Sequence, residues 1–382
     1  MYTLTRTLIL AILIALITAQ SAIAHEHVDM TSPRADQPLV QIALLLDTSN
    51  SMDGLIDQAK SQLWRIVNEV SRAQRDGRHP RLEVALYEYG NNRLQSHRQW
   101  IRNVLAFSTD LDAVSEALFS LSTSGGEEYC GAVIDRSLTE LQWSPRRDAL
   151  KMIYIAGNEP FTQGPTPYKK ALHAAIKEDV IVNTIFCGNF EDGRRGAWMK
   201  AARIADGSYA VINQDRKIAH ISAPQDDEIA RLSVQLNGTY LGFGHGGAKR
   251  KARQHSQDKA AASVAQGAPV ARAVAKASAI YKQSEWDLVD AMEEGSVGLA
   301  NLAPASLPEP MRAMNTKERK EFVAKSAKKR KKLQAKILKL NEAREKHVAK
   351  KKGVNSKADK TLDEALIEAL QKAGKSRGFS FE

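Results

Sequence analysis

One carboxylate and two hydroxyls lie close together early in the sequence. Asp47, Ser49 and Ser51 follow an almost unbroken apolar run at 40–46, which predicts a strand buried on both faces. Their two-residue spacing places the three side chains in one tight turn where that strand ends. All three offer hard oxygen ligands of the kind that hold Mg²⁺. The turn is therefore predicted to be a divalent-metal site that binds a partner rather than transforming a substrate.

Two further segments could complete this site. The loop at 123–128 precedes a predicted helix, where Thr123 can supply a third hydroxyl and the neighbouring glycines let the backbone approach a cation. The segment 157–159 follows another short buried strand. Ligand sites in parallel sheets lie at the carboxyl ends of the strands, so we expect these segments to meet the turn at Asp47.

The elements that must position these residues alternate along the chain. An α/β fold with a doubly wound, mostly parallel sheet is predicted, because strands and helices of this length succeed one another. The predicted strands are 40–46, 82–89, 152–156, 180–186 and 208–212. The predicted helices are 54–72, 111–121 with Thr109 as its N-cap, 131–141, 168–177 and 197–205.

The three polar segments occur in the order found in von Willebrand factor type A (VWA) domains, and residues 38–215 resemble that family. The resemblance implies a Rossmann-like sheet and a metal-ion-dependent adhesion site (MIDAS). It implies that Asp47, Ser49 and Ser51 form the first loop of that site. It implies that Thr123 supplies the second, with Ser124 as a neighbouring alternative. A cation held there, Mg²⁺ or alternatively Ca²⁺ or Mn²⁺, would bind an acidic side chain of a protein partner.

The third loop departs from the family pattern, which places an Asp after the fourth strand. Asn158 occupies that position in this chain. Its amide oxygen can bind a cation but brings no negative charge, which weakens cation binding. Glu159 and Glu127 are the alternatives that could restore the charge, and Glu128 is another.

The N-terminus is predicted to direct export. Residues 1–24 have the features of a secretory signal peptide, with Arg6, an apolar run at 8–17 and a small-x-small cleavage site ending at Ala24. That run is short for a transmembrane helix, and no later segment is apolar enough to span a bilayer. A flexible leader is predicted at 25–37, and the mature protein is expected to be periplasmic or secreted.

Two cysteines remain in the predicted mature chain. An oxidising compartment favours a disulfide between Cys130 and Cys187. Two separately buried thiols are the alternative, and sequence spacing does not choose between them.

The sequence changes character beyond the α/β pattern. Residues 216–314 are predicted to form a helical and irregular extension, with helices at 226–237 and 270–292 and a polar, Ala-rich segment at 249–266. This region and the tail that follows loosely resemble the C-terminal halves of exported bacterial VWA proteins.

Residues 315–382 form a basic helical tail. They carry 21 Lys and Arg against 9 Asp and Glu, a net charge of +12, while the whole chain has +11. The rest of the chain is thus close to neutral, which argues against specific nucleic-acid binding. A long helix is predicted at 316–352, capped by Thr316, and a short one at 362–370. The apolar stripe of the long helix favours a hairpin or coiled coil, and its basic face could alternatively contact an anionic surface.

No motif of a catalytic site was found. The sequence lacks a Gly-x-x-x-x-Gly-Lys-Ser/Thr phosphate loop, a Gly-x-Ser-x-Gly elbow and a His-Glu-x-x-His zinc motif. The sequence therefore predicts a binding protein and not an enzyme. The alternative hypothesis is an envelope-associated structural protein that binds anionic surfaces through its basic helices and uses a metal-free VWA scaffold.

Overall fold

The computed structural model describes residues 37–213, 220–352 and 361–381. The predicted signal peptide, and all of the predicted leader except its last residue, lie outside the described residues. The described residues from Pro38 onward pack as one compact unit.

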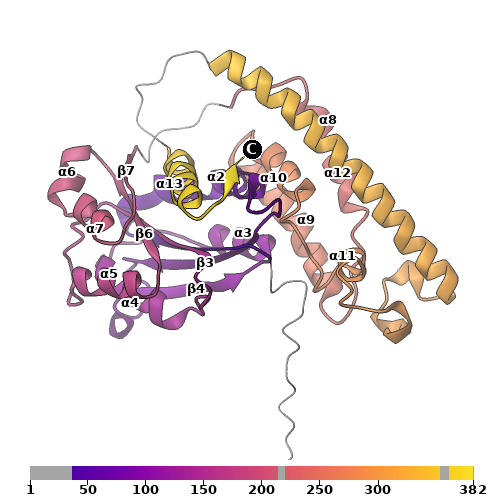
Figure 1. Cartoon of the computed structure of the whole chain (residues 1–382), viewed down its shortest axis with the longest axis horizontal. Helices are drawn as coiled ribbons and strands as arrows, with labels where there is room; N and C mark the ends of the chain where they lie inside the picture. Colours follow the sequence, from indigo (N-terminus) through magenta and orange to yellow (C-terminus); the bar gives the residue numbers. More distant parts are fainter. Residues whose placement is uncertain (1–36, 214–219, 353–360, 382) are drawn as a thin grey trace, which may run out of the picture. The chain divides into compact units, whose positions relative to one another are not determined.

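A six-stranded sheet is built around β1 (Leu39–Asp47), every residue of which is buried. The strands lie in the order β4-β3-β1-β5-β6-β7 (Figure 1). The remaining strands are β3 (Arg81–Tyr89), β4 (Ile101–Ser108), β5 (Leu150–Gly157), β6 (Ile181–Cys187) and β7 (Tyr209–Ile212). All neighbouring strands are parallel except β3 and β4. The carboxyl ends of β1, β3 and β5 therefore meet at one edge of the sheet.

Helices cover both faces of this sheet. Alternate residues of β1 point to opposite sides, so that Leu44 and Leu46 belong to one apolar core and Ala43 and Leu45 to another. The first core is covered by α2 (Asp53–Arg72), α3 (Leu111–Phe119) and α13 (Leu362–Ser376). The second is covered by α4 (Cys130–Glu140), α5 (Tyr168–Lys177) and α7 (Trp198–Ile204), with α6 (Phe190–Arg195) before α7. The predicted doubly wound α/β fold is confirmed.

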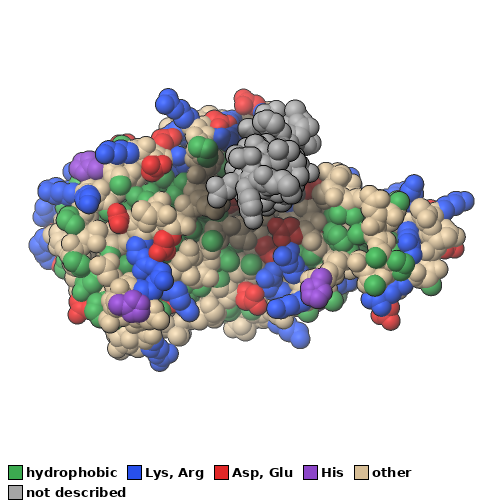
Figure 2. Space-filling model, turned by 90° about the horizontal axis from the view of Figure 1, so that it is seen from below, with side chains coloured by type: hydrophobic (Ala, Val, Ile, Leu, Met, Phe, Trp, Pro, Cys, Tyr) green, Lys and Arg blue, Asp and Glu red, His purple; other side chains and the backbone are tan. Residues whose placement is uncertain are grey.

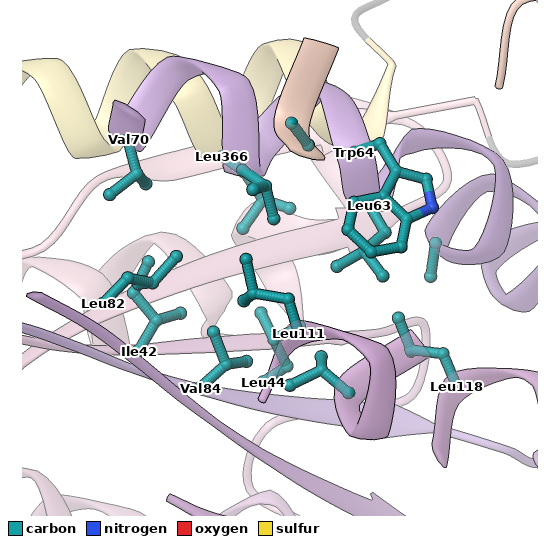
Figure 3. Packing of buried hydrophobic residues seen from close by; sticks show 14 of the residues in the cluster. Ile42, Leu44, Leu63, Trp64, Val70, Leu82, Val84, Leu111, Leu118 and Leu366 are labelled. Atoms are coloured by element: carbon teal, nitrogen blue, oxygen red, sulfur yellow. The ribbon is translucent and has the colours of Figure 1, made fainter. Parts of the chain in front are cut away.

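The last helix of the chain completes one face of the sheet. Leu366 of α13 points into the core between α2 and the strands (Figure 3), and its carbonyl oxygen accepts a 3.1 Å hydrogen bond from the Tyr154 hydroxyl. The short strands β2 (Ala73–Gln74) and β8 (Ser380–Phe381) pair antiparallel beside it. The helix is longer than the predicted 362–370, and it packs on the six-stranded sheet rather than extending the basic tail.

Between β7 and α13 lies the helical extension. Its helices are α8 (Asp226–Asn237), α9 (Gly247–Val264), α10 (Ala268–Ala277), α11 (Leu288–Glu293) and α12 (Thr316–Lys352). Short 3-10 segments occur at Asn50–Met52, Ser96–Arg98, Leu299–Asn301, Pro304–Ser306 and Glu309–Met311. The predicted helix at 270–292 is in fact two helices, and the segment at 249–266 is largely helical. Among the described residues, no helix combines the length and apolar character needed to cross a bilayer.

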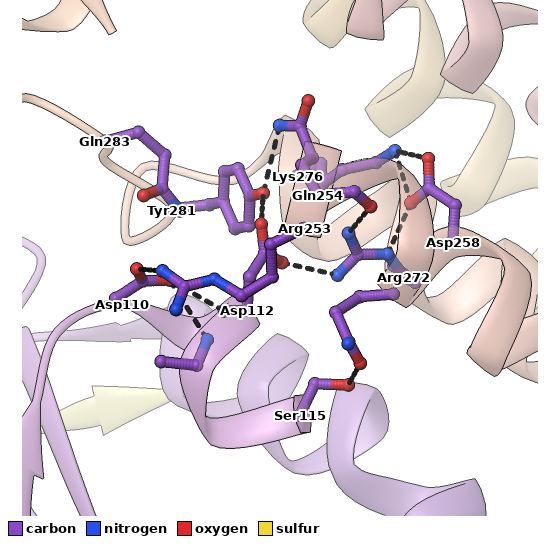
Figure 4. Close-up of polar contacts among 12 residues, drawn as sticks. Asp110, Asp112, Ser115, Arg253, Gln254, Asp258, Arg272, Lys276, Tyr281 and Gln283 are labelled. Carbon is purple, nitrogen blue, oxygen red and sulfur yellow. Dashed lines mark hydrogen bonds and ion pairs between the residues drawn. The ribbon is translucent and has the colours of Figure 1, made fainter. Parts of the chain in front are cut away.

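A buried polar network joins the extension to the sheet domain (Figure 4). Asp112 of α3 accepts hydrogen bonds of 2.7 Å from the Arg272 guanidinium and from the Tyr281 hydroxyl. The Lys276 ammonium lies 2.9 Å from both carboxylate oxygens of Asp258, which also pairs with Arg272. Because each buried charge has a partner of opposite sign, the network fixes α9 and α10 against α3.

The N-capping residues of two helices differ from the predicted ones by one residue. The carboxylate of Asp110, and not Thr109, caps α3 by accepting from the backbone N–H groups of Asp112 and Ala113. At α12 the side chain of Asn315 accepts from the backbone N–H of Glu318, so the cap precedes Thr316. Both residue types are strong N-caps, and neighbouring candidates cannot be separated by sequence alone.

Candidate metal site

The first loop is assembled as predicted, at the carboxyl end of β1. Asp47 is fully buried, and its Oδ1 accepts a 2.8 Å hydrogen bond from the Ser49 N–H. The hydroxyls of Ser49 and Ser51 are 3.3 Å apart. The backbone N–H of Thr48 donates to the Tyr89 carbonyl at 2.8 Å, which ties the turn to the end of β3. One carboxylate and two hydroxyls are thus held together.

Asn158 joins this cluster from the end of β5, the strand beside β1. Its Nδ2 donates a 3.0 Å hydrogen bond to the Ser51 hydroxyl. Its Oδ1 is buried, and so is Oδ2 of Asp47, and neither atom has a hydrogen-bond partner among the described residues. Two buried oxygen acceptors without a donor are the arrangement that a cation would satisfy.

Glycines allow the backbone to approach the Asp47 carboxylate. A Cβ added at Gly90 would lie 2.8 Å from Oδ1 of Asp47, and one added at Gly157 would lie 3.0 Å from Oδ2. Gly90 also has a φ of +78°, a conformation that L side chains rarely adopt. The space on both sides of the carboxylate is therefore open only because these two residues lack side chains.

The second loop lies beside the first, but the Thr123 hydroxyl has a different partner. The backbone N–H of Ser124 donates to the Thr48 carbonyl at 3.0 Å and fixes the two loops together. The Thr123 hydroxyl donates to the carboxylate of Asp53, the first residue of α2. Asp53 was not among the predicted site residues, although it continues the two-residue spacing of Asp47, Ser49 and Ser51.

The three candidate glutamates differ in burial. Glu128 is buried, whereas Glu127 and Glu159 are exposed. The Tyr129 hydroxyl lies 3.5 Å from the Glu127 carboxylate. A Cβ added at Gly90 would lie 2.8 Å from Cγ of Glu128, the same distance as from Oδ1 of Asp47. Glu128 is thus the glutamate that the fold holds beside Asp47.

Burial and repulsion between neighbouring acids disfavour the ionised forms of Asp47 and Glu128. Burial raises the pKa of Asp47 to about 7 against the opposing hydrogen bonds from Ser49, and the negative charges of Glu128 and Glu159 raise it further. Burial likewise raises the pKa of Glu128 to about 7, with Glu159 as the next cause. A bound cation would favour the ionised form of both carboxyls.

The donor set fits a hard divalent cation. The candidate ligands are the Asp47 carboxylate, the hydroxyls of Ser49 and Ser51 and the amide oxygen of Asn158, all of which are oxygen donors. Within the ranges that the structure describes, no group of three or more His, Cys, Asp or Glu side chains is arranged to hold a metal. The site therefore depends on hydroxyl and amide oxygens as well as on carboxylates.

No disulfide joins the two cysteines in this structure, so the possible disulfide is not formed. Cys130 belongs to the core on the α4 side of the sheet, and Cys187 to the core on the α2 side. Side chains on opposite faces of a sheet cannot bond without rearranging the strands between them. Burial raises the pKa of the Cys130 thiol, whose sulfur lies 3.8 Å from the Tyr89 hydroxyl.

Comparison with solved structures finds similar domains at low sequence identity. BatB from Bacteroides thetaiotaomicron is 17% identical, with 45% of this chain and 90% of that chain covered and a TM-score of 0.35. The VWA domain of SpRpn10 is 16% identical, with 45% and 87% covered and a TM-score of 0.33. PTMP1 from the mussel byssus, described with a zinc-occupied MIDAS motif, is 14% identical, with 47% and 43% covered and a TM-score of 0.35. No protein-family model and no curated protein matches the sequence.

The fold agrees with the family that the sequence resembles. Five strands are parallel, the sixth is an antiparallel edge strand, and helices cover both faces. The first loop of the motif lies at the carboxyl end of the central strand β1, beside the end of β5. The six-stranded sheet and the helices on its two faces therefore have a von Willebrand factor type A-like fold, to which a helical C-terminal region is joined.

Proposed function

We propose that this protein binds a protein partner through a divalent cation held at the end of β1. Asp47, Ser49, Ser51 and Asn158 would hold the cation, and an acidic side chain of the partner would complete its coordination. The observation that carries this proposal is the pair of buried oxygens, Oδ2 of Asp47 and Oδ1 of Asn158, that have no hydrogen-bond partner among the described residues.

The chemistry of the ligands supports a role in binding. When bound, the cation would supply a positive centre with a preference for octahedral oxygen coordination. Hydroxyl and amide ligands neutralise little of its charge, so it would retain affinity for a partner carboxylate. We assign the site no catalytic role, and we propose that the protein acts in the periplasm or outside the cell, as the features of residues 1–24 favour.

Thermal denaturation tests whether the site binds a cation. EDTA should lower the melting temperature of the wild type, and Mg²⁺ or Mn²⁺ should restore it, because binding to the folded state alone stabilises it. Asp47→Ala should abolish the response to cations. Asp57→Ala is the matched control, because Asp57 is an exposed acid on α2 and its loss should leave the response intact. Identical melting curves with and without cations in the wild type would refute the metal site.

A pull-down from envelope extract tests the partner. The wild type and Asp57→Ala should retain a partner in Mg²⁺ and release it in EDTA, and Asp47→Ala should not retain it. Retention of the same partner by Asp47→Ala would show that binding does not use the cation.

A second candidate function is favoured by a row of lysines on α12. The buried side of this helix includes Val323, Arg330, Leu333 and Ile337. On the other side lie exposed lysines with no ion pair inside the described ranges: Lys325, Lys328, Lys332, Lys339, Lys346 and Lys350. An α-helix turns by about 100° and rises by about 1.5 Å per residue, so these lysines lie on one side of α12 in a stripe about 38 Å long. On the face drawn in Figure 2, by contrast, basic and acidic side chains are interspersed.

The stripe suits an anionic surface such as a bilayer with acidic headgroups. Point charges along a straight helix attract such a surface without inserting into it, and the attraction is screened by salt. Vesicle flotation tests this binding. One set of vesicles contains phosphatidylcholine alone, and in the other about one lipid in three is phosphatidylglycerol.

A matched pair of variants makes the vesicle test specific. The first replaces four stripe lysines with glutamine: Lys328, Lys332, Lys339 and Lys346. The control replaces four exposed lysines of the sheet domain: Lys169, Lys170, Lys177 and Lys200. Binding to the anionic vesicles should be lost only in the first variant. Equal binding by both variants would refute the role of the stripe.

A further inference from the structure

The proposed site contains a single carboxylate with which to neutralise a divalent cation. Asp47 is the single charged side chain among the first loop and Asn158. A cation held by these residues alone would keep one unit of positive charge in a buried position, which is unfavourable without a further anion. The position after β5, from which a second carboxylate is expected, is occupied by the neutral Asn158.

Glu128 is placed to supply the missing charge. It precedes α4 by two residues and is 7% exposed. A Cβ added at Gly90 would touch both Cγ of Glu128 and Oδ1 of Asp47 at 2.8 Å, so the two side chains lie against the same glycine. No Cβ stands between them because position 90 has none.

The loop that carries Glu128 is fixed on both sides of that glycine. The backbone N–H of Asn92 donates to the Gly125 carbonyl at 2.6 Å. A Cβ at Gly126 would collide with the carbonyl oxygen of Gly90, so the backbones are in close contact there. The backbone of the loop that carries Glu128 is therefore held against the backbone at Gly90.

Neither carboxylate has a basic partner. Across the described residues, no ion pair includes Asp47 or Glu128, although many other acids of the chain are paired. Among charged groups, Glu159 and Glu127 act most strongly on Glu128, and both repel its negative charge. Two adjacent buried carboxylates without a counter-ion are destabilising, and a cation bound between them removes this repulsion.

We propose that Glu128 supplies the second carboxylate ligand of the divalent cation. It would replace the acidic side chain that is absent at position 158, where this chain has Asn. The inference rests on the proposed metal site and identifies one further ligand of it. A cation held by two carboxylates carries no net charge. Its attraction for an acidic partner side chain is weaker, and neutral oxygen donors of a partner compete better for the open position.

Isothermal titration with Mg²⁺ and with Mn²⁺ tests the role of Glu128. Glu128→Gln keeps the shape and removes the charge, and it should lower cation affinity by at least about tenfold. Glu127→Gln is the matched control, since it makes the same change at the exposed neighbour and should alter affinity less than about twofold. The melting temperature of Glu128→Gln in EDTA should be no lower than that of the wild type. This comparison checks that the variant folds.

A second variant separates direct coordination from a distant effect of charge. Glu128→Asp keeps the charge but shortens the side chain by one carbon. It should lose affinity as Glu128→Gln does, if the carboxylate contacts the cation. Wild-type affinity in Glu128→Gln or in Glu128→Asp would overturn the inference while leaving the metal site intact. Absence of cation binding by the wild type would overturn both.

Discussion

Replacing Leu366 with alanine should destabilise the protein strongly, because this side chain closes the sheet domain from the last helix. Leu366 is 3% exposed and packs in the core between α2 and the strands (Figure 3). A Leu→Ala change in such a core costs about 2–5 kcal/mol, and more where the surroundings cannot collapse. A cavity of about 20 Å³ already lies beside Leu366, lined by residues that include Leu63 and Tyr154.

The expected loss is in the middle of that range. The Tyr154 hydroxyl holds the carbonyl of Leu366, so α13 cannot shift freely to fill the enlarged cavity. We expect the free energy of unfolding to fall by about 3–4 kcal/mol. With a urea dependence of about 3 kcal/mol per molar, the unfolding midpoint should fall by about 1 M. Urea denaturation followed by circular dichroism measures this shift.

Leu338→Ala provides the matched control. Leu338 is a leucine on α12 that is 37% exposed, so the same substitution should change the free energy of unfolding by less than about 1 kcal/mol. If Leu366→Ala shifted the midpoint no further than Leu338→Ala does, α13 would not be part of the sheet domain.

Three further predictions address titration, the buried network and the thiols. In EDTA the folded state should retain a proton on Asp47 between its ordinary pKa of 3.8 and about 7, so the free energy of unfolding should fall by about 4 kcal/mol as the pH rises through that window. Urea denaturation across this pH range should show that fall in the wild type and a flatter profile in Asp47→Asn. Arg272→Met should cost about 3–5 kcal/mol by leaving Asp112 buried without its partner, and the double variant with Asp112→Leu should recover part of that loss. Alkylation in denaturant without reductant should label both Cys130 and Cys187, because no disulfide joins them, and an unlabelled chain by mass spectrometry would contradict this.

The core of the fold could be predicted from the sequence because its signals are local. The apolar run of β1 and the helical spacing of α2 are properties of consecutive residues. The edge strand β4 was missed, because most of its residues are only partly buried and it pairs antiparallel, so no simple pattern marks it. The packing of α13 was missed because it depends on contacts with α2 and β5, far away in the sequence.

The positions of the candidate site residues were predictable to a similar extent. Asp47, Ser49 and Ser51 belong to one turn, and Asn158 follows a buried strand. Their proximity at the carboxyl ends of the strands could therefore be predicted from the sequence. The Thr123 hydroxyl pairs with Asp53, which the motif alone does not indicate. The burial of Glu128 depends on the close approach of two loop backbones at Gly90. Such an approach is a property of the folded chain, which spacing along the sequence cannot reveal.

The packing of α13 and β8 has a consequence for how the chain folds. The Ser380 hydroxyl donates to the Gln74 carbonyl across 306 residues of sequence, and the backbone N–H of Leu362 donates to Gln58 across 304. Closing loops of this length is slow, although each doubling adds only about 0.6 kcal/mol. During synthesis, the part of one apolar face that α13 covers stays open until residues 361–381 have emerged. A chain that stalls before then exposes this apolar surface to chaperones and proteases. The sheet domain can therefore be completed only after the whole helical extension has been synthesised.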